Sequence, residues 1–211
     1  MNPLRPFLDP LPLVAILRGL RPEEAVAVGD ALVAAGFRVV EVPLNSPSPF
    51  ESIRLLAERL GERALVGAGT VMTPAQVEQV AEAGGRLIVT PHGDPAVIGA
   101  AKARGLLCAP GIATPTEGFA ALAAGADALK LFPAEMVGPP VLKAMRAVFP
   151  KDTIFLPVGG IAPGTMRPFV AAGADGFGLG SALYKPGMAA DEVGANARAF
   201  AAAWQELKAT P

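Results

Sequence analysis

The chain alternates short apolar runs with longer helix-compatible segments along almost its whole length. The apolar runs are about four or five residues long, which suits buried strands, and helical stretches of about ten to fifteen residues separate them. Buried strands that alternate with helices in this way are typical of a parallel sheet covered by helices. The predicted strands are Val14–Leu17, Val39–Val42, Ala64–Gly67, Leu87–Thr90, Leu106–Ala109, Ala128–Phe132, Ile154–Val158 and Gly176–Leu179.

Glycines and prolines mark the limits of the predicted helices. Several helices have a proline near the first turn, where its missing N–H is not needed. A glycine stands between a helix and the next strand at six places, where a left-handed backbone costs glycine least. The predicted helices include Pro22–Ala35, Pro74–Ala83, Thr116–Ala124 and Pro163–Ala172. The glycines are Gly36, Gly61, Gly84, Gly105, Gly125 and Gly173.

Eight strand–helix units in 211 residues predict an α/β fold with a single (β/α)8 TIM-barrel domain over residues 1–211. Such barrels typically have about 250 residues, so this one would be compact. A doubly wound open sheet is the alternative, because buried strands look alike in both folds. The chain lacks a Gly-rich dinucleotide fingerprint, which favours the barrel. Residues 1–12 are expected to form a lead-in segment, with Pro3–Leu11 as a short helix or a cap over the barrel bottom.

Composition excludes several classes of partner. Hydrophobic residues make up 52% of the chain, and the net charge is only −1 with Lys and Arg scattered, so neither disorder nor nucleic-acid or membrane binding is expected. No apolar stretch is long enough to span a bilayer, and the N-terminus lacks a signal-peptide pattern. Cys108 is the only cysteine, which fits a reducing cytoplasm, and His92 is the only histidine, which excludes a zinc site of several His and Cys.

Lys130 is the most informative single residue. It lies within the predicted strand Ala128–Phe132, where alternation puts Leu129 and Leu131 on one face and Lys130 on the other. An ammonium among apolar neighbours loses hydration, so its pKa should fall below the usual value of about 10.4. A partly neutral lysine can attack a carbonyl carbon and form a Schiff base. The alternative is a surface lysine at a strand end.

Two further charged residues share the inward phase of their strands. Glu41 is in phase with Val39, and Arg18 is in phase with Ile16. We therefore expect both to be buried together with Lys130, where opposite charges compensate. Glu41 could then act as a general acid and base, and Arg18 could hold an anionic group and lower the lysine pKa. Taken singly, each could instead be a charge at the rim.

The ends of the third and fourth predicted strands carry polar groups. Thr70 follows two closely spaced glycines, so its hydroxyl could bind a carboxylate or carbonyl. It could instead be a helix N-cap, although Thr73 before Pro74 is better placed for that. Pro91 and His92 follow the fourth strand, and His92 is favoured as a rim residue rather than a catalyst.

Glycine pairs end the last two predicted strands. Gly159 and Gly160 follow the seventh strand, and Gly180 with Ser181 follows the eighth. Consecutive backbone N–H groups at glycines form anion-binding concavities, and these two loops are the common phosphate site of such barrels. The glycines could also serve only tight turns, but their position favours a phosphate site.

Four of these motifs together resemble the aldolases of 2-keto-3-deoxy-6-phosphogluconate and 2-keto-3-deoxy-6-phosphogalactonate, the family of the Entner–Doudoroff pathway and its galactonate counterpart. The motifs are Glu41, Gly67–Thr70, Lys130–Glu135 and Gly159–Ile161, and the resemblance extends from about Leu13 to Trp204. It implies a (β/α)8 barrel, a homotrimer, no metal or other cofactor, a Schiff base on Lys130 and acid–base catalysis by Glu41. The predicted substrate-binding residues are Arg18, Asn45, Thr70, Pro91 and Phe132.

The branch of the family depends on fewer residues. Segments Ile16–Gly19 and Glu41–Pro47 look like the phosphogalactonate enzymes. Phosphogluconate enzymes usually carry an arginine where Asn45 stands, so Arg18 is the candidate replacement for its contact with the substrate carboxylate. The segment Phe132–Glu135 is closer to the phosphogluconate form. We expect a phosphogalactonate aldolase with broad tolerance of the C4 configuration.

The predicted reaction is cleavage of the phosphorylated keto acid to pyruvate and glyceraldehyde 3-phosphate. Alternatives are another phosphate-binding barrel enzyme, such as an epimerase or a thiamin-phosphate-type synthase, and an aldolase acting on 4-hydroxy-2-oxoglutarate. A non-catalytic sugar-phosphate binding protein is a further alternative. The pairing of Glu41 with Lys130 argues against it, because binding alone needs no desolvated amine.

Overall fold

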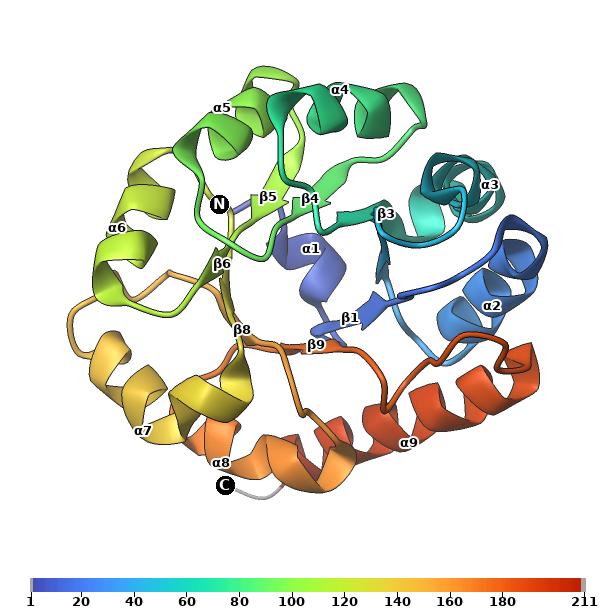
Figure 1. Ribbon diagram of the computed structural model, residues 1–211. Coiled ribbons are helices and arrows are strands. Elements are labelled where there is room, and N and C mark those ends of the chain that lie inside the picture. Colours follow the sequence, from blue (N-terminus) through green and yellow to red (C-terminus); the bar gives the residue numbers. More distant parts are fainter. Residues whose placement is uncertain (1, 210–211) are drawn as a thin grey trace.

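The computed structural model describes residues 2–209, and its strands lie inside a ring of helices (Figure 1). The strands are β1 Leu13–Ile16, β2 Val39–Pro43, β3 Leu65–Gly69, β4 Leu87–Val89, β5 Leu107–Ala109, β6 Gly111–Ile112, β7 Leu129–Leu131, β8 Phe155–Pro157 and β9 Phe177–Leu179. Every predicted strand is present to within two residues at each end.

Helices follow the strands around the ring. Helices α2 to α6 each begin with a proline, as the sequence pattern predicts. The six glycines predicted to end helices all have positive φ angles, between 52° and 100°. The helices are α1 Arg5–Leu8, α2 Pro22–Ala34, α3 Pro49–Leu60, α4 Pro74–Glu82, α5 Pro95–Ala103, α6 Pro115–Ala123, α7 Ala134–Arg146, α8 Met166–Ala171 and α9 Ala190–Ala209, with 3-10 turns at Gly61–Arg63 and Pro163–Thr165. Within residues 2–209, no helix is long and apolar enough to cross a membrane.

The strands form a curled parallel sheet. Six strands pair in the order β5-β4-β3-β2-β1-β9, and three more pair in the order β6-β7-β8. The sequence places the end of the fifth strand at Ala109, but the structure continues it as β6 beyond Pro110. Proline has no N–H to donate to a ladder, which explains the interruption. At the other edge, Val158 forms a parallel bridge with Gly178.

Two groups of buried side chains confirm the predicted alternation along the strands. Val40 and Leu129 belong to the larger group, which includes helix residues. The smaller group contains strand residues that point the other way, together with Leu4 and Leu8 at helix α1. Helix α1 therefore packs into the interior of the curled sheet, whereas the other helices cover its outer face (Figure 1).

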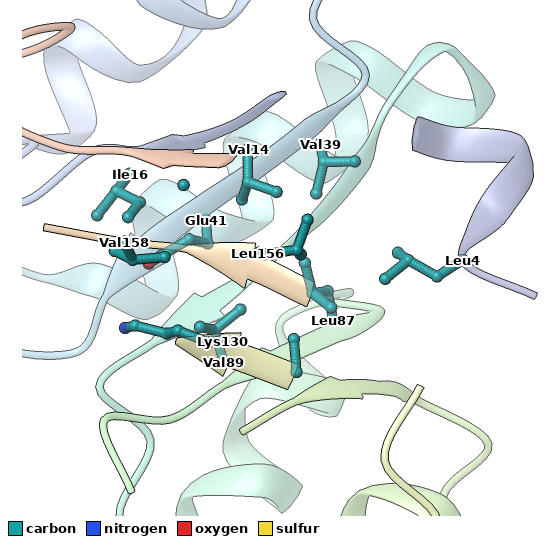
Figure 2. Close-up of a pocket in the computed structure, with 12 residues that line it drawn as sticks. Leu4, Val14, Ile16, Val39, Glu41, Leu87, Val89, Lys130, Leu156 and Val158 are labelled. Carbon is teal, nitrogen blue, oxygen red and sulfur yellow. The ribbon is translucent and has the colours of Figure 1, made fainter. Parts of the chain in front are cut away.

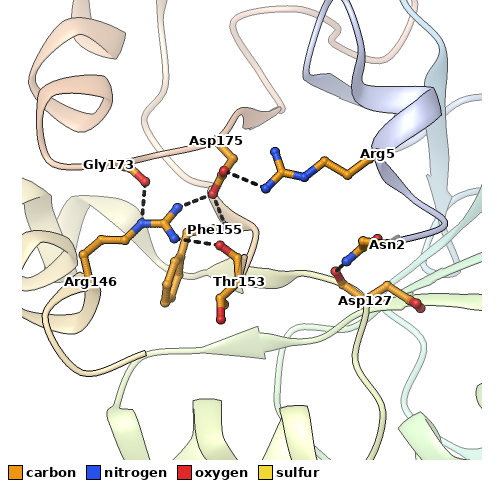
Figure 3. A network of polar contacts seen from close by, with 8 residues as sticks. All are labelled: Asn2, Arg5, Asp127, Arg146, Thr153, Phe155, Gly173 and Asp175. Carbon is orange, nitrogen blue, oxygen red and sulfur yellow. Dashed lines mark hydrogen bonds and ion pairs between the residues drawn. The ribbon is translucent and has the colours of Figure 1, made fainter. Parts of the chain in front are cut away.

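Polar contacts hold the N-terminal segment against one end of the strands (Figure 3). The Asn2 side chain donates a hydrogen bond of 2.6 Å to the carbonyl of Asp127, and Arg5 lies 3.3 Å from a carboxylate oxygen of Asp175. Asp127 and Asp175 precede strands β7 and β9, so this is the amino-terminal end of the strands.

The same network anchors helix α7. The Arg146 guanidinium forms an ion pair with Asp175 and donates to the carbonyls of Gly173 and Thr153 at 2.7 Å (Figure 3). The amide of Phe155 also donates to Asp175, at 2.9 Å. These contacts and helix α1 occupy the amino-terminal end of the sheet. Most of the predicted site residues lie at the opposite, carboxyl-terminal end of the strands.

Candidate active site

Lys130 is buried at the middle of β7. Its side chain is 6% exposed, and its amine lies 4.7 Å from the centre of the Phe132 ring. Leu129 and Leu131 point to the helices, as predicted. Burial lowers the pKa of Lys130, the positive charge of Arg18 lowers it further, and Glu41 opposes both effects.

Glu41 is buried in β2 and is 1% exposed. Burial raises its pKa to about 7, although the positive charges of Lys130 and Arg18 act in the other direction. Its Oε2 has no hydrogen-bond partner among the described residues. A Cβ atom on Gly69 would overlap the Glu41 carboxyl group, so a larger residue at this position of β3 would displace that carboxyl group. A carboxyl group with this pKa can both give and accept a proton near neutral pH.

Lys130 and Glu41 line the same small cavity inside the curled sheet. Most of its other lining residues are apolar, which accounts for the opposite pKa shifts of the two groups. Leu4 lies at one end, and the Lys130 amine points toward the opposite end, where Ile16 and Val158 lie (Figure 2). The cavity has a volume of about 20 Å³, enough for one water molecule. Proton transfer through a water could therefore connect the two groups.

Lys130 also lines a larger cavity of about 600 Å³ at the carboxyl-terminal ends of the strands. This volume is in the range of small-molecule sites. Lys130 thus lines both the small interior cavity and the open pocket. Of the predicted site residues, those lining the larger cavity are Arg18, Asn45, Lys130, Phe132, Gly159, Gly160, Gly180 and Ser181.

Arg18 is at the rim of this cavity, and the prediction that it is buried with Glu41 and Lys130 is wrong. It is exposed, because β1 ends at Ile16 and strand alternation no longer applies beyond that residue. Its guanidinium donates a hydrogen bond of 2.8 Å to the Asn45 side chain. The next residue, Gly19, donates from its backbone to Ser46 Oγ at 2.9 Å, which ties the loops after β1 and β2 together.

Thr70 and Pro91 are partly exposed and do not line either cavity. Thr70 follows Gly69 and has a φ of 56°, a left-handed conformation that is unusual for a residue other than glycine. It is not the cap of α4, because Thr73 accepts the hydrogen bond from the Gln76 backbone instead, at 3.2 Å.

The chain that carries Lys130 and Glu41 also matches a known protein family. The family described as "Aldolase: KDPG and KHG aldolase" matches residues 6–196. The chain belongs to the KDPG and KHG aldolase family. This confirms the resemblance expected from the motifs around Glu41 and Lys130.

Similar aldolases include a "Probable 2-dehydro-3-deoxy-6-phosphogalactonate aldolase" from Rhizobium meliloti (strain 1021), 51% identical over 93% of this chain and 92% of the relative. A "2-dehydro-3-deoxy-6-phosphogalactonate aldolase" from Escherichia coli (strain K12) is 46% identical over 93% of this chain and 96% of the relative. The solved "Native KDPGal structure" superimposes with a TM-score of 0.93 and 45% identity, covering 95% of this chain and 98% of that one. The expected similarity to the phosphogalactonate branch is confirmed.

The larger cavity is also lined by residues for which the sequence predicted no role. Tyr184 and Lys185 lie on the loop that follows Ser181, and Glu135 lies at the start of α7. The Tyr184 hydroxyl donates a hydrogen bond of 3.1 Å to Glu24 on α2. Lys185 lies only four positions after Ser181, so the sequence could have indicated that it lines the cavity. The hydrogen bond between Tyr184 and Glu24 joins residues too far apart in the sequence to be predicted.

Two glycines and a serine also line the larger cavity. Gly159 and Gly160 have φ angles of 114° and 62°, and Ser181 is exposed. Successive positive φ angles at glycines can turn backbone N–H groups to one side, where an anion can bind. Within residues 2–209, no cluster of three or more His, Cys, Asp or Glu side chains is placed to hold a metal ion.

Proposed function

We propose that this chain is a class I aldolase that cleaves 2-keto-3-deoxy-6-phosphogalactonate to pyruvate and glyceraldehyde 3-phosphate through a Schiff base on Lys130. The observation that carries the proposal is a buried lysine with a lowered pKa that shares a cavity with a carboxyl group of pKa about 7. An amine that is neutral in part of the molecules can attack a ketone. A carboxyl group that titrates near neutral pH can move the protons of that reaction.

In the first half-reaction, the neutral Lys130 amine attacks the C2 ketone and forms a carbinolamine. The protonated Glu41 donates a proton to the carbinolamine hydroxyl, which leaves as water. The product is an iminium ion that can accept the electron pair of the C3–C4 bond. Glu41 is now ionised, and the burial that raises its pKa makes it a stronger base than an exposed carboxylate.

In the second half-reaction, Glu41 accepts the proton of the C4 hydroxyl, directly or through one water molecule. The C3–C4 bond breaks, its electron pair moves into the iminium to form an enamine, and glyceraldehyde 3-phosphate leaves. Protonation of the enamine carbon by Glu41 restores the iminium. Hydrolysis by water then releases pyruvate and the free Lys130 amine, so neither a redox step nor an external co-reactant is required.

Substrate binding is proposed to use both ends of the larger cavity. Arg18, fixed by Asn45, would hold the substrate carboxylate. Phe132, which also lines this cavity, would provide an apolar contact near the reacting carbons. The phosphate group would bind the backbone N–H groups at Gly159, Gly160 and Gly180 and the hydroxyl of Ser181.

The preference for the galacto epimer is supported by Asn45 and by the two phosphogalactonate relatives. The test compares kcat/KM for the two C4 epimers, with pyruvate release measured in a coupled assay. We expect turnover of both, with higher kcat/KM for the phosphogalactonate, and no turnover by Lys130→Met. Preference for the gluco epimer would overturn the assignment of the branch, and full activity of Lys130→Met would overturn the mechanism.

We further propose that the curled sheet closes into a single-domain (β/α)8 barrel. The bridge between Val158 and Gly178 links β8 to β9, and only Pro110 separates β5 from β6. A crystal structure that shows main-chain pairing at both junctions would establish closure, and an open gap at either would exclude it.

A homotrimer is the proposed assembly. The family resemblance implies it, and exposed apolar residues near α6 and α7 support it: Phe119 is 45% exposed and stacks on Phe149, and Val148 is 59% exposed. Light scattering after size-exclusion chromatography should give three times the chain mass. Cys108 is the only cysteine of the sequence and cannot form a disulfide within the chain, which supports the proposal of a cytoplasmic location.

A further inference from the structure

The side chain of Glu135 lies over the two glycines proposed to bind phosphate. A Cβ atom on Gly160 would lie 2.6 Å from Cγ of Glu135, and one on Gly159 would overlap a carboxylate oxygen. Glu135 also lines the larger cavity and has no role in the proposed mechanism. The Glu135 carboxylate thus lies close to the glycines at which the substrate phosphate is expected.

We propose that Glu135 limits the affinity of the anion subsite at Gly159 and Gly160, because its carboxylate competes with the ligand for that place. This inference rests on the proposed function, because that function puts the substrate phosphate at these glycines. The Glu135 carboxylate and a phosphate cannot occupy the same space beside these glycines, and their charges repel at short distance. A ligand must therefore displace Glu135, which lowers the affinity of the subsite for any anion.

The local structure permits this displacement. Glu135 is exposed, lies at the second position of α7 and forms no ion pair or hydrogen bond with any residue of the described chain. Helix α7 bends at Gly138, which has a φ of 69°, so the turn that carries Glu135 is short. Rotation about its side-chain bonds can take the carboxylate into solvent without a change in the strands.

The same cavity favours a doubly charged replacement. Arg18 and Lys185 line it together with the Lys130 amine, and Lys185 has no carboxylate partner among residues 2–209. A phosphate dianion gains more from these positive charges than the single charge of Glu135 does. Glu135 therefore weakens the binding of phosphate at the subsite but does not prevent it.

A structural role for Glu135 makes a different prediction. A carboxylate in the first turn of a helix interacts favourably with the helix dipole. If this were its only role, Glu135→Gln would lower the melting temperature slightly and leave phosphate affinity unchanged. Glu51 is a matched control, because it is an exposed glutamate in the first turn of α3 that does not line the cavity.

The test measures the Kd of inorganic phosphate by calorimetry and the KM of the phosphorylated substrate, at low ionic strength. Glu135→Gln should lower both by roughly three- to tenfold, and less at high salt, where charge interactions are screened. The KM of the same sugar acid without its phosphate should not change. Glu135→Asp, which keeps the charge but shortens the reach, should give a smaller effect, and Glu51→Gln should give none.

Ser181→Ala separates the two ways in which the inference can fail. If Ser181→Ala weakens phosphate binding while Glu135→Gln does not strengthen it, Glu135 is not a competitor and the proposed phosphate subsite stands. If neither variant changes phosphate binding, phosphate binds elsewhere, and both the subsite and the inference are wrong. Equal tightening by Glu51→Gln would also overturn the inference, because it would show a general effect of net charge.

Discussion

Replacing Glu41 by glutamine should make the protein more stable at alkaline pH while removing most of its activity. Glutamine has nearly the same shape as glutamate but no charge, so it removes the cost of burying an ionised carboxylate next to apolar residues. The two effects have the same cause. Burial that destabilises the ionised form of Glu41 also makes it a usable acid and base.

The size of the stability change follows from the pKa shift. Burial raises the pKa of Glu41 from its usual 4.5 to about 7, a difference of about 2.5 units, and each unit corresponds to about 1.4 kcal/mol. The protonated form is favoured in the folded state, so Glu41 contributes its full stability below about pH 4.5 and loses it as the pH rises through about 7. The loss is about 3 kcal/mol at pH 7 to 8 and approaches about 3.5 kcal/mol at higher pH, and Glu41→Gln should avoid it.

The assay is urea unfolding of wild type and variant at pH 5 and pH 8, at one protein concentration because assembly affects stability. The variant should be more stable than wild type by about 3 kcal/mol at pH 8, with most of this difference absent at pH 5. Turnover should fall by about 10²- to 10⁴-fold with substrate binding retained. Glu51→Gln should change neither quantity. A variant that is less stable at pH 8, or equally stabilised at both pH values, would refute the reasoning.

Other residues of the site and the fold give further predictions. Gly69→Ala should abolish turnover and destabilise the protein by about 1–3 kcal/mol, because the new methyl group overlaps the Glu41 carboxyl group; wild-type activity with unchanged stability would contradict this. Asp175→Asn, which removes the ion pair with Arg146, should lower the free energy of unfolding by about 1–3 kcal/mol and leave kcat unchanged; a lowered kcat in folded protein would contradict its structural role. Lys130→Arg should be inactive in the coupled assay, because a guanidinium stays protonated and cannot form a Schiff base; measurable turnover would contradict this.

Much of the fold could be predicted because local patterns determine it. Alternation in the strand that contains Val39 put Glu41 on the inward face, and the structure agrees. Glycines such as Gly36 ended helices where predicted, since only a left-handed backbone fits there. The predictions failed where a pattern stopped applying: Arg18 lies beyond the end of β1, and Pro110 interrupts a strand that the apolar pattern could not follow.

Contacts between distant segments could not be predicted. Nothing in the sequence around Glu135 indicates that its side chain covers Gly159 and Gly160, because that contact depends on how α7 returns to the sheet. The ion pair of Arg5 with Asp175 likewise joins residues 170 positions apart. The prediction of a phosphate site at these glycines came from the general position of such sites in barrels, and the competing carboxylate was missed.

The most direct test of the account is borohydride reduction in the presence of pyruvate, followed by peptide mass spectrometry. Reduction fixes an iminium as a stable secondary amine at the lysine that formed it. The account predicts one pyruvate-derived adduct per chain, on the peptide that contains Lys130, and none in Lys130→Met. No adduct, or an adduct on another lysine, would contradict it.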